Sequence, residues 1–256
     1  STSRSGFETA IPYYFNLSPT SDATVTPRYF GKRGTQVSGE YRYLDQKYSG
    51  VSQLDFMPSD TQTTRDNRYY VKLKHEHDLG NGFTAGYNVG KVSDDNYFAD
   101  MSSLISVTSQ VNLNQEAFLN YSDNDWNARL LTQKFQNLTT SSPYERLPSL
   151  TVNHGKIFED EYGFTDYEVN TNFSLIQFER NNNFTGVSPR GTRVTTRPSL
   201  SIPFERPYGF VTPKLSMDMK YYDLNDANVT SKDLYIPTLS FDSGLYLDKK
   251  ISFKES

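Results

Sequence analysis

The feature of this sequence that most constrains its fold is a period-two alternation of apolar and polar residues along most of the chain. Residues 83–90 read FTAGYNVG, and residues 111–120, 194–202 and 211–221 alternate in the same way. Because successive side chains of a β-strand point to opposite faces, this pattern predicts strands with one apolar and one polar face. The runs last about 9–12 residues, the length that a tilted strand needs to cross a bilayer.

The composition is compatible with a transmembrane β-barrel. The mean hydropathy of −0.68 is low, but only alternate residues of a barrel strand face lipid. Aromatic residues make up 14% of the chain, which argues against disorder. A membrane-spanning helix is excluded because no apolar run approaches about 18 residues. The net charge is −4 and the charges are scattered, so no nucleic-acid partner is predicted.

Turn-forming residues separate the alternating segments, and on their spacing we predict about thirteen antiparallel strands and a single domain over residues 1–256. Helix is expected only as one short turn near residues 94–101. A soluble structural or adhesive β-rich protein also alternates, but its strands average about 5–6 residues. The polar faces here also carry small and amide side chains, such as Asn112 and Asn114, which suit a hydrated lumen.

Several motifs near the beginning of the chain are more specific. Residues 7–19 read FETAIPYYFNLSP and residues 22–29 read DATVTPRY. They are followed by GEYRYL at 39–44, MPSD at 57–60, and KVSD at 91–94 with Tyr97-Phe98 after it. Together these motifs resemble the barrel of the LptD family of lipopolysaccharide-assembly proteins. The resemblance is dense over residues 7–100 and thinner afterwards.

The resemblance implies a location in the bacterial outer membrane and a non-enzymatic function, the insertion of lipopolysaccharide into the outer leaflet. It also implies a barrel of about 26 strands that opens laterally between its first and last strands. The implied partners are lipopolysaccharide, membrane lipid, an LptE-type plug lipoprotein, and periplasmic Lpt bridge proteins that act through a jellyroll. No cofactor or metal is implied. A passive porin is the main alternative.

This sequence is expected to supply the N-terminal half of such a barrel domain, with the jellyroll and the C-terminal half lying outside it. It begins at Ser1 without an initiator methionine and reads as a mature or excised segment. An incompletely closed sheet has two edges of unpaired backbone groups, which lipid cannot satisfy. We therefore expect the edges to be held by the rest of a longer polypeptide or, in an assembly intermediate, by the barrel-insertion machinery.

Two prolines interrupt strands that are expected to pair as the first hairpin, over residues 7–15 and 22–30. Proline cannot donate to a ladder, so Pro12 and Pro27 predict a weakened seam, and the resemblance associates both positions with the lateral gate. The alternative is that they merely kink strands or deter edge aggregation. Asn16 is a candidate donor to lipid phosphate or sugar near the gate, with the start of a turn as its alternative.

Other polar residues are assigned supporting positions. Arg28, Glu40 and Arg42 are expected to face the lumen, where they would tune hydration or contact a plug. His75 and His77 share one strand face at a spacing compatible with a metal, but we interpret them as interfacial polar residues and predict no metal site.

No residue is predicted to be catalytic, because nothing in the sequence suggests a nucleophile with its base. The acidic pair Asp94-Asp95 is interpreted as part of a solvated loop. The resemblance starts the first strand on the periplasmic side. Strict alternation then places the longer connectors, 59–67 and 93–108, on that side too.

Overall fold

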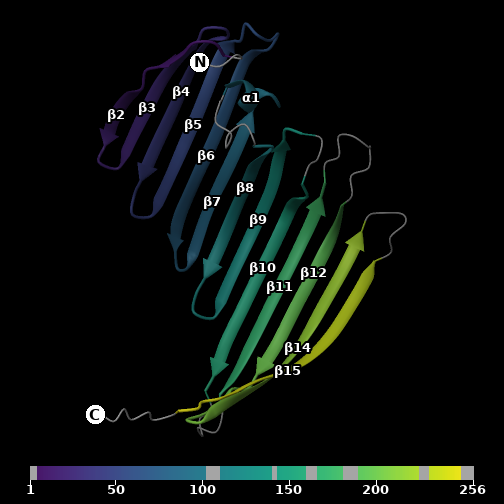
Figure 1. Cartoon of the computed structure of the whole chain (residues 1–256). Helices are drawn as coiled ribbons and strands as arrows, with labels where there is room; N and C mark the ends of the chain where they lie inside the picture. Colours follow the sequence, from purple (N-terminus) through teal and green to yellow (C-terminus); the bar gives the residue numbers. More distant parts are fainter. Residues whose placement is uncertain are drawn as a thin grey trace, which may run out of the picture. The chain divides into compact units, whose positions relative to one another are not determined.

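The computed structural model describes residues 5–101, 110–139, 143–159, 166–180, 190–224 and 231–248. Within them the chain is almost entirely antiparallel β-sheet, with one short helix (Figure 1). The strands are β1 (Glu8–Ala10), β2 (Tyr13–Ser18), β3 (Ser21–Phe30), β4 (Gly34–Leu44), β5 (Tyr48–Ser59), β6 (Asp66–Gly80), β7 (Phe83–Val92), β8 (Asn112–Ser122), β9 (Trp126–Asn137), β10 (Glu145–Phe158), β11 (Tyr167–Glu179), β12 (Arg190–Ser201), β13 (Phe204–Arg206), β14 (Gly209–Leu224) and β15 (Lys232–Leu245). The helix α1 (Tyr97–Met101) confirms the predicted helical turn.

The short strands β1 and β2 are two segments of one interrupted strand. Both pair with β3, and Glu8 opposite Phe30 and Tyr13 opposite Val25 belong to the same register. The interruption falls at residues 11–12, opposite Pro27, which cannot donate a backbone hydrogen bond to Ile11. The predicted first hairpin is therefore confirmed, with its first strand divided in two.

The same interruption occurs between β12 and β13. Ile202 donates to the carbonyl of Pro213 and Phe204 lies opposite Val211, so both segments follow β14 in one register. Pro203 stands at the break. Fifteen strands are assigned within the described residues, and counting each interrupted strand once leaves thirteen, as predicted.

The chain divides into two compact units. The first comprises Ser1–Tyr121, Arg129–Leu150 and Ile176–Gly191, and the second comprises Ser122–Ala128, Thr151–Leu175 and Thr192–Ser256. In the first unit β3 to β7 each pair with the next strand in sequence. In the second, β14 pairs with β15 over its length from Gly209 to Tyr222.

The sheet ends in open edges, as expected. Among the strands that the structure describes, β2 pairs only with β3 and β15 pairs only with β14. Each therefore has one side whose backbone groups have no strand partner. Among the described residues, none of the helical structure has both the length and the apolar character needed to cross a bilayer.

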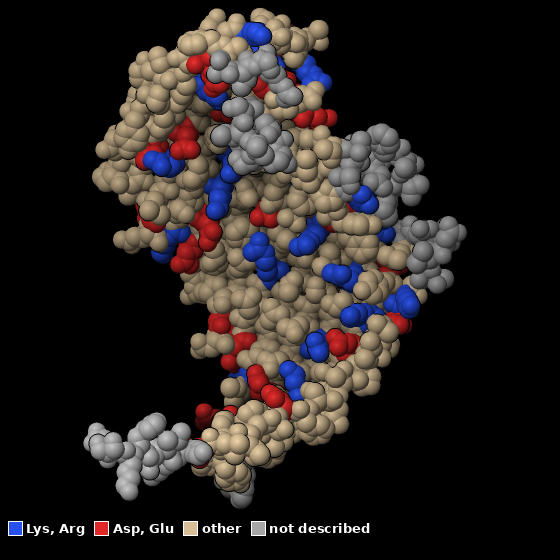
Figure 2. All heavy atoms as spheres, viewed as in Figure 1, with Lys and Arg blue, Asp and Glu red and all other residues tan. Residues whose placement is uncertain are grey.

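The two faces of the first unit differ in polarity, as the alternation predicts. A row of directly opposed residues on one face, the apolar face, runs Val25, Gly39, Leu54 and Val71 across β3 to β6. The next row on the other face, the polar face, runs Thr24, Glu40, Gln53 and Lys72 across the same strands. Leu54 is 52% exposed although it is central in its strand. Figure 2 shows acidic and basic side chains interspersed on the face in view rather than gathered by sign.

Tight turns join the strands at one end of the first unit. Between β6 and β7, Gly80, Asn81 and Gly82 all have positive φ angles, of 80°, 53° and 81°. Glycine and asparagine tolerate this conformation, so the local sequence determines the turn.

The longer connectors lie together at the opposite end. The amide of Thr61, between β5 and β6, donates to the carbonyl of Arg33 in the β3–β4 turn, and α1 lies at the same end of the strands (Figure 1). The described parts of these connectors therefore lie at the same end of the strands as the start of the first strand. Which side of a membrane this is remains a prediction.

A small apolar core lies beneath α1, at the end of the polar face. The helix contributes Tyr97, Phe98 and Met101, which pack against strand residues including Phe30, Met57 and Val92, three positions in register with the polar face. The buried members of this core are Phe30, Met57, Val92, Tyr97, Phe98, Met101 and Leu113. The helix α1 is thus anchored to the sheet by apolar burial.

Candidate functional site

The backbone hydrogen bonds of the first hairpin show which residues of the first strand bond to β3 and which face the unpaired edge. Ile11 donates to the carbonyl of Pro27 at 3.2 Å, and Gly31 donates to the carbonyl of Phe7 at 2.7 Å. In an antiparallel ladder, hydrogen-bonded and non-hydrogen-bonded pairs alternate. Odd-numbered residues of the first strand therefore bond to β3, and even-numbered ones direct their backbone groups to the unpaired edge.

This register separates the two prolines. Pro27 lies opposite Ile11 in a hydrogen-bonded pair, and its missing N–H leaves that pair with one bond instead of two. Pro12 is even-numbered, so its missing N–H removes a donor from the unpaired edge rather than from the hairpin. Each proline therefore weakens a different strand junction. The sequence alone did not distinguish the two junctions.

Asn16 lies on the polar face opposite Asp22 and lines an open hollow of about 690 Å³ near the β2–β3 turn. Arg42 borders the same hollow and makes two 2.8 Å bonds to Asp22, through Nε and a terminal nitrogen. The turn itself is stabilised by Ser18, whose hydroxyl accepts from the amide of Thr20, and not by Asn16. Asn16 is therefore presented to the hollow from within β2.

The three residues predicted to face a lumen share the polar face. Arg28 donates to Glu8 at 2.6 Å and to Gln36 at 3.3 Å, and Glu40 lies 3.7 Å from Arg42. Arg42 is 52% exposed, so solvent screens its ion pair with Asp22 and the pair contributes little to stability. Arg28 is held more firmly, because its guanidinium also lies 5.0 Å from the centre of the Phe30 ring.

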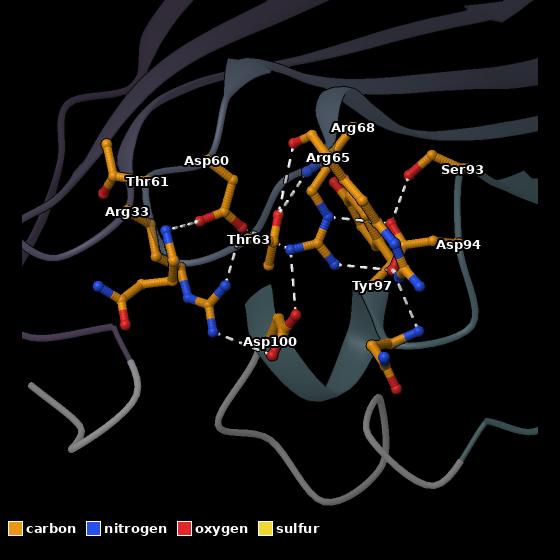
Figure 3. Close-up of polar contacts among 12 residues, drawn as sticks. Arg33, Asp60, Thr61, Thr63, Arg65, Arg68, Ser93, Asp94, Tyr97 and Asp100 are labelled. Carbon is orange, nitrogen blue, oxygen red and sulfur yellow. Dashed lines mark hydrogen bonds and ion pairs between the residues drawn. The ribbon is translucent and has the colours of Figure 1, made fainter.

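A charged cluster of Arg33, Asp60, Arg68, Asp94 and Asp100 lies beside α1 (Figure 3). Arg68 bonds to Asp60 at 2.5 Å and to Asp94 at 2.9 Å, and lies 3.0 Å from Asp100. Arg33 contacts Asp60 at 2.8 Å and Asp100 at 2.9 Å. The Arg68 side chain is 1% exposed and Asp60 is fully enclosed, so the cluster joins the β3–β4 turn, the β5–β6 connector and α1 by buried ion pairs.

The charges of this cluster balance, three arginines against three aspartates, once Arg65, which contacts Asp94 from the surface, is included. Burial acts to raise the pKa of the Asp60 carboxyl, but the Gln62 amide and the Arg68 guanidinium outweigh it and hold the pKa below its ordinary value. At Asp94 burial likewise acts to raise the pKa of the carboxyl, but hydrogen bonds from Arg68 and Ser93 outweigh it and lower the pKa below its ordinary value. Both carboxylates are therefore ionised at neutral pH.

The interpretation of Asp94-Asp95 as a solvated loop is wrong for Asp94. Its side chain is 8% exposed and accepts from both Arg65 and Arg68, while Asp95 is exposed. Sequence reasoning missed the cluster because its members come from connectors far apart in the chain. The available signal was that the motifs MPSD and KVSD end in Asp60 and Asp94.

The two histidines lie on the apolar face among tyrosines, near the tight turns. Tyr43 Oη and His75 Nδ1 are 2.7 Å apart, His75 stacks on Tyr87, and His77 contacts Tyr48. Within the described ranges no group of three or more potential ligands could hold a metal. This packing accords with the interfacial interpretation.

Comparison with known proteins gives concordant matches. A family model described as "LptD: LPS transport system D" matches residues 66–256. Relatives named "LPS-assembly protein LptD" are 36% identical in Aromatoleum aromaticum, 36% in Nitrosomonas europaea and 37% in Ralstonia nicotianae, each over 97% of this chain. The matched region makes up 31%, 35% and 31% of those relatives, so the chain spans about a third of their length.

Proposed function

The chain belongs to the LptD family of LPS-assembly proteins, and from that premise we propose that it forms the N-terminal half of an outer-membrane β-barrel domain. That domain would insert lipopolysaccharide into the outer leaflet of the Gram-negative outer membrane. The observation that carries this proposal concerns the first strand, which lies at the sheet edge and is interrupted at residues 11–12. There it lies opposite Pro27, whose missing N–H leaves the hydrogen-bonded pair with one bond instead of two.

The two faces of the sheet support the proposed membrane setting. The apolar face exposes Leu54 at 52%, Tyr29 at 49% and Val37 at 44%, and the strands that carry them have 10–12 residues. A soluble protein rarely exposes a continuous apolar face of this kind, whereas acyl chains would cover it. The polar face, with Arg28, Glu40 and Arg42, would border a hydrated lumen and contact an LptE-type plug lipoprotein.

The proposed mechanism has no covalent step. Lipopolysaccharide has acyl chains that prefer the bilayer and sugars that prefer water, so its two parts would follow different paths. The acyl chains would leave through a seam at the outer edge of the first strand, while the glycan would pass along the polar face. Asn16, which faces the hollow beside this edge, is placed to donate to a sugar or phosphate.

The weak seam distinguishes this proposal from a passive porin, whose closed wall needs no opening. A missing donor at Pro12 means that a strand docking on this edge forms one bond fewer than an uninterrupted ladder would. The proposed partners at the edges are the remainder of the barrel and, during folding, the barrel-insertion machinery. Periplasmic Lpt bridge proteins would deliver the lipid through a jellyroll.

Photocrosslinking in the full-length protein tests this function. A photoreactive amino acid at Asn16 is expected to form adducts with lipopolysaccharide in growing cells, because this position borders the proposed path. The matched control is Asn88, on the polar face of β7 and away from the edge. Equal adducts at both positions would favour diffuse passage through the lumen, and the absence of adducts at Asn16 would contradict the proposal.

A further inference from the structure

A second open hollow, the tyrosine hollow, lies at the tight-turn end of the first unit on the apolar face. Its volume is about 320 Å³. Three rings and three short polar side chains line it, those of Tyr41, Tyr43, Tyr48, Thr20, Ser21 and Asp45. Among the described residues that line it, none is a lysine or an arginine. Aromatic, hydroxyl and carboxylate groups thus meet without a cation on a face that is otherwise apolar.

The ring of Tyr43 lies flat against the sheet. Its partner on β5 is Gly50, where a Cβ would overlap the ring and hydroxyl of Tyr43. The hydroxyl reaches across β5 to His75 Nδ1 at 2.7 Å. The imidazole of His75 is in turn stacked on Tyr87, with 5.4 Å between the ring centres. Tyr43 is therefore held in one orientation by a neighbouring glycine and a hydrogen bond.

This orientation differs from that of an ordinary interfacial tyrosine. Such a residue keeps its ring in lipid and extends its hydroxyl to water. Tyr43 instead turns its hydroxyl back to the sheet, so that its ring forms the floor of the tyrosine hollow. The rings of Tyr41 and Tyr48 flank it at 5.5 and 6.1 Å between centres, and both residues are 40% exposed. The three rings form a preorganised aromatic trough.

Polar groups border this trough on the side of the turns. Thr20 and Ser21 belong to the β2–β3 turn and the start of β3, and Asp45 follows β4. The amide of Leu44 donates to the carbonyl of Thr20 at 2.9 Å, which holds the two turns together. Ring faces attract the C–H groups of a sugar, and hydroxyl and carboxylate oxygens bond to its O–H and N–H groups. The hollow therefore suits a sugar, whereas a phosphate would require cationic donors.

The tyrosine hollow adjoins the hollow that Asn16 lines on the polar face. Thr20, Ser21, Tyr43 and Leu44 line both, so the two hollows meet around the turn end of β3 and β4. The face below the tyrosine hollow is the one proposed to meet acyl chains. An occupant at this level therefore combines a polar sugar with a hydrocarbon part, as a glycolipid does.

We propose that the tyrosine hollow binds the acylated sugar headgroup of lipopolysaccharide on the outer wall of the barrel. A sugar ring would stack on Tyr43 between Tyr41 and Tyr48, and its polar groups would bond to Thr20 and Asp45. This inference rests on the proposed function, with the turn end at the outer leaflet. It adds a site that receives the headgroup after the acyl chains have entered the bilayer.

Binding of a defined glycolipid to the full-length protein in detergent tests the site. The probe is a tritiated, acylated glucosamine disaccharide without phosphates, and its retention on immobilised protein gives the Kd. Tyr43→Ala removes the floor of the hollow and is expected to weaken binding by about five- to thirtyfold. Gly50→Ala is expected to have a similar effect although Gly50 does not line the hollow, because the added methyl group displaces the Tyr43 ring.

Gly39→Ala is the matched control. Gly39 lies on the same face of β4, but within 4 Å a Cβ there would meet only the carbonyl of Leu54, at 3.9 Å. Its binding should equal that of the wild type. His75→Phe keeps a ring beside Tyr87 and removes the bond to Tyr43, so it is expected to weaken binding by about two- to tenfold. Heat-modifiable migration on gels establishes that each variant is folded.

Unchanged binding in folded Tyr43→Ala would overturn the site. Displacement of the probe by phosphatidylglycerol as readily as by the unlabelled glycolipid would overturn its assignment to a sugar. So would binding of the disaccharide only when it carries phosphates. Crosslinking at Asn16 tests the proposed function separately: adducts there without glycolipid binding would overturn the site alone, and binding without adducts would support the site while contradicting the proposed path.

Discussion

Replacing Arg68 with alanine is expected to destabilise the folded protein by about 3–5 kcal/mol, because it leaves buried carboxylates without their partner. Arg68 is 1% exposed and contacts Asp60, Asp94 and Asp100 at once. Without it, three acidic groups would face Arg33 and Arg65 alone, close to a core that excludes water. We expect α1 to detach from the sheet and to become accessible to protease.

Arg65→Ala is the matched control for this variant. Arg65 is three residues away and is also paired with Asp94, but its side chain is 51% exposed. Loss of that surface pair should change stability by about 0–1 kcal/mol. Urea-dependent unfolding of the full-length barrel in detergent, followed by heat-modifiable migration on gels, measures both variants. Equal midpoints for Arg68→Ala and wild type would show that the charged cluster does not hold α1.

Replacing both Pro12 and Pro27 with alanine is expected to reduce export of lipopolysaccharide by stiffening the seam. Alanine at position 27 restores a donor toward the carbonyl of Ile11, and alanine at position 12 restores one at the unpaired edge. Each new hydrogen bond is worth about 0.5–1.5 kcal/mol. Only the bond restored at position 12 lies across the seam, and by itself it would lower the open fraction of the seam by about two- to tenfold. The bond restored at position 27 stiffens the hairpin behind the seam.

The single variants separate the two junctions. Pro27→Ala should slow hydrogen exchange within the β2–β3 hairpin, whereas Pro12→Ala should act only where another strand docks on the edge. Pro203→Ala is the control, since Pro203 interrupts a strand in the same way but lies away from the first hairpin. The measurement is the rate at which newly made lipopolysaccharide reaches the cell surface. Unchanged export in the double variant would contradict a gating role for these prolines.

The strand pattern was predictable from sequence because it depends on neighbouring residues only. Alternation in residues such as 83–90 reports the two faces of β7 directly, and Gly80 and Gly82 mark its turn. Even the strand number was recovered, since an X-Pro break inside a ladder leaves the register unchanged. The small helix was found for the same reason, from a short local segment.

The charged cluster was not predictable in this way. Arg33, Asp60 and Asp100 meet only because three connectors fold to one end of the sheet, and no local pattern encodes that meeting. Asp94 looked solvated because it stands beside Asp95 in a polar segment. Likewise, the register of β1 and β2 against β3 decides which strand edge loses a backbone donor at each proline.

The central claim is that one face of these strands meets acyl chains and the other meets water. Single spin labels at positions 71–74 of β6, in the full-length protein in its membrane, test it most directly. We predict that Val71 and Leu73 are accessible to oxygen and shielded from a water-soluble relaxation agent, and that Lys72 and Lys74 show the reverse. Equal access of the water-soluble agent to all four positions would contradict the account.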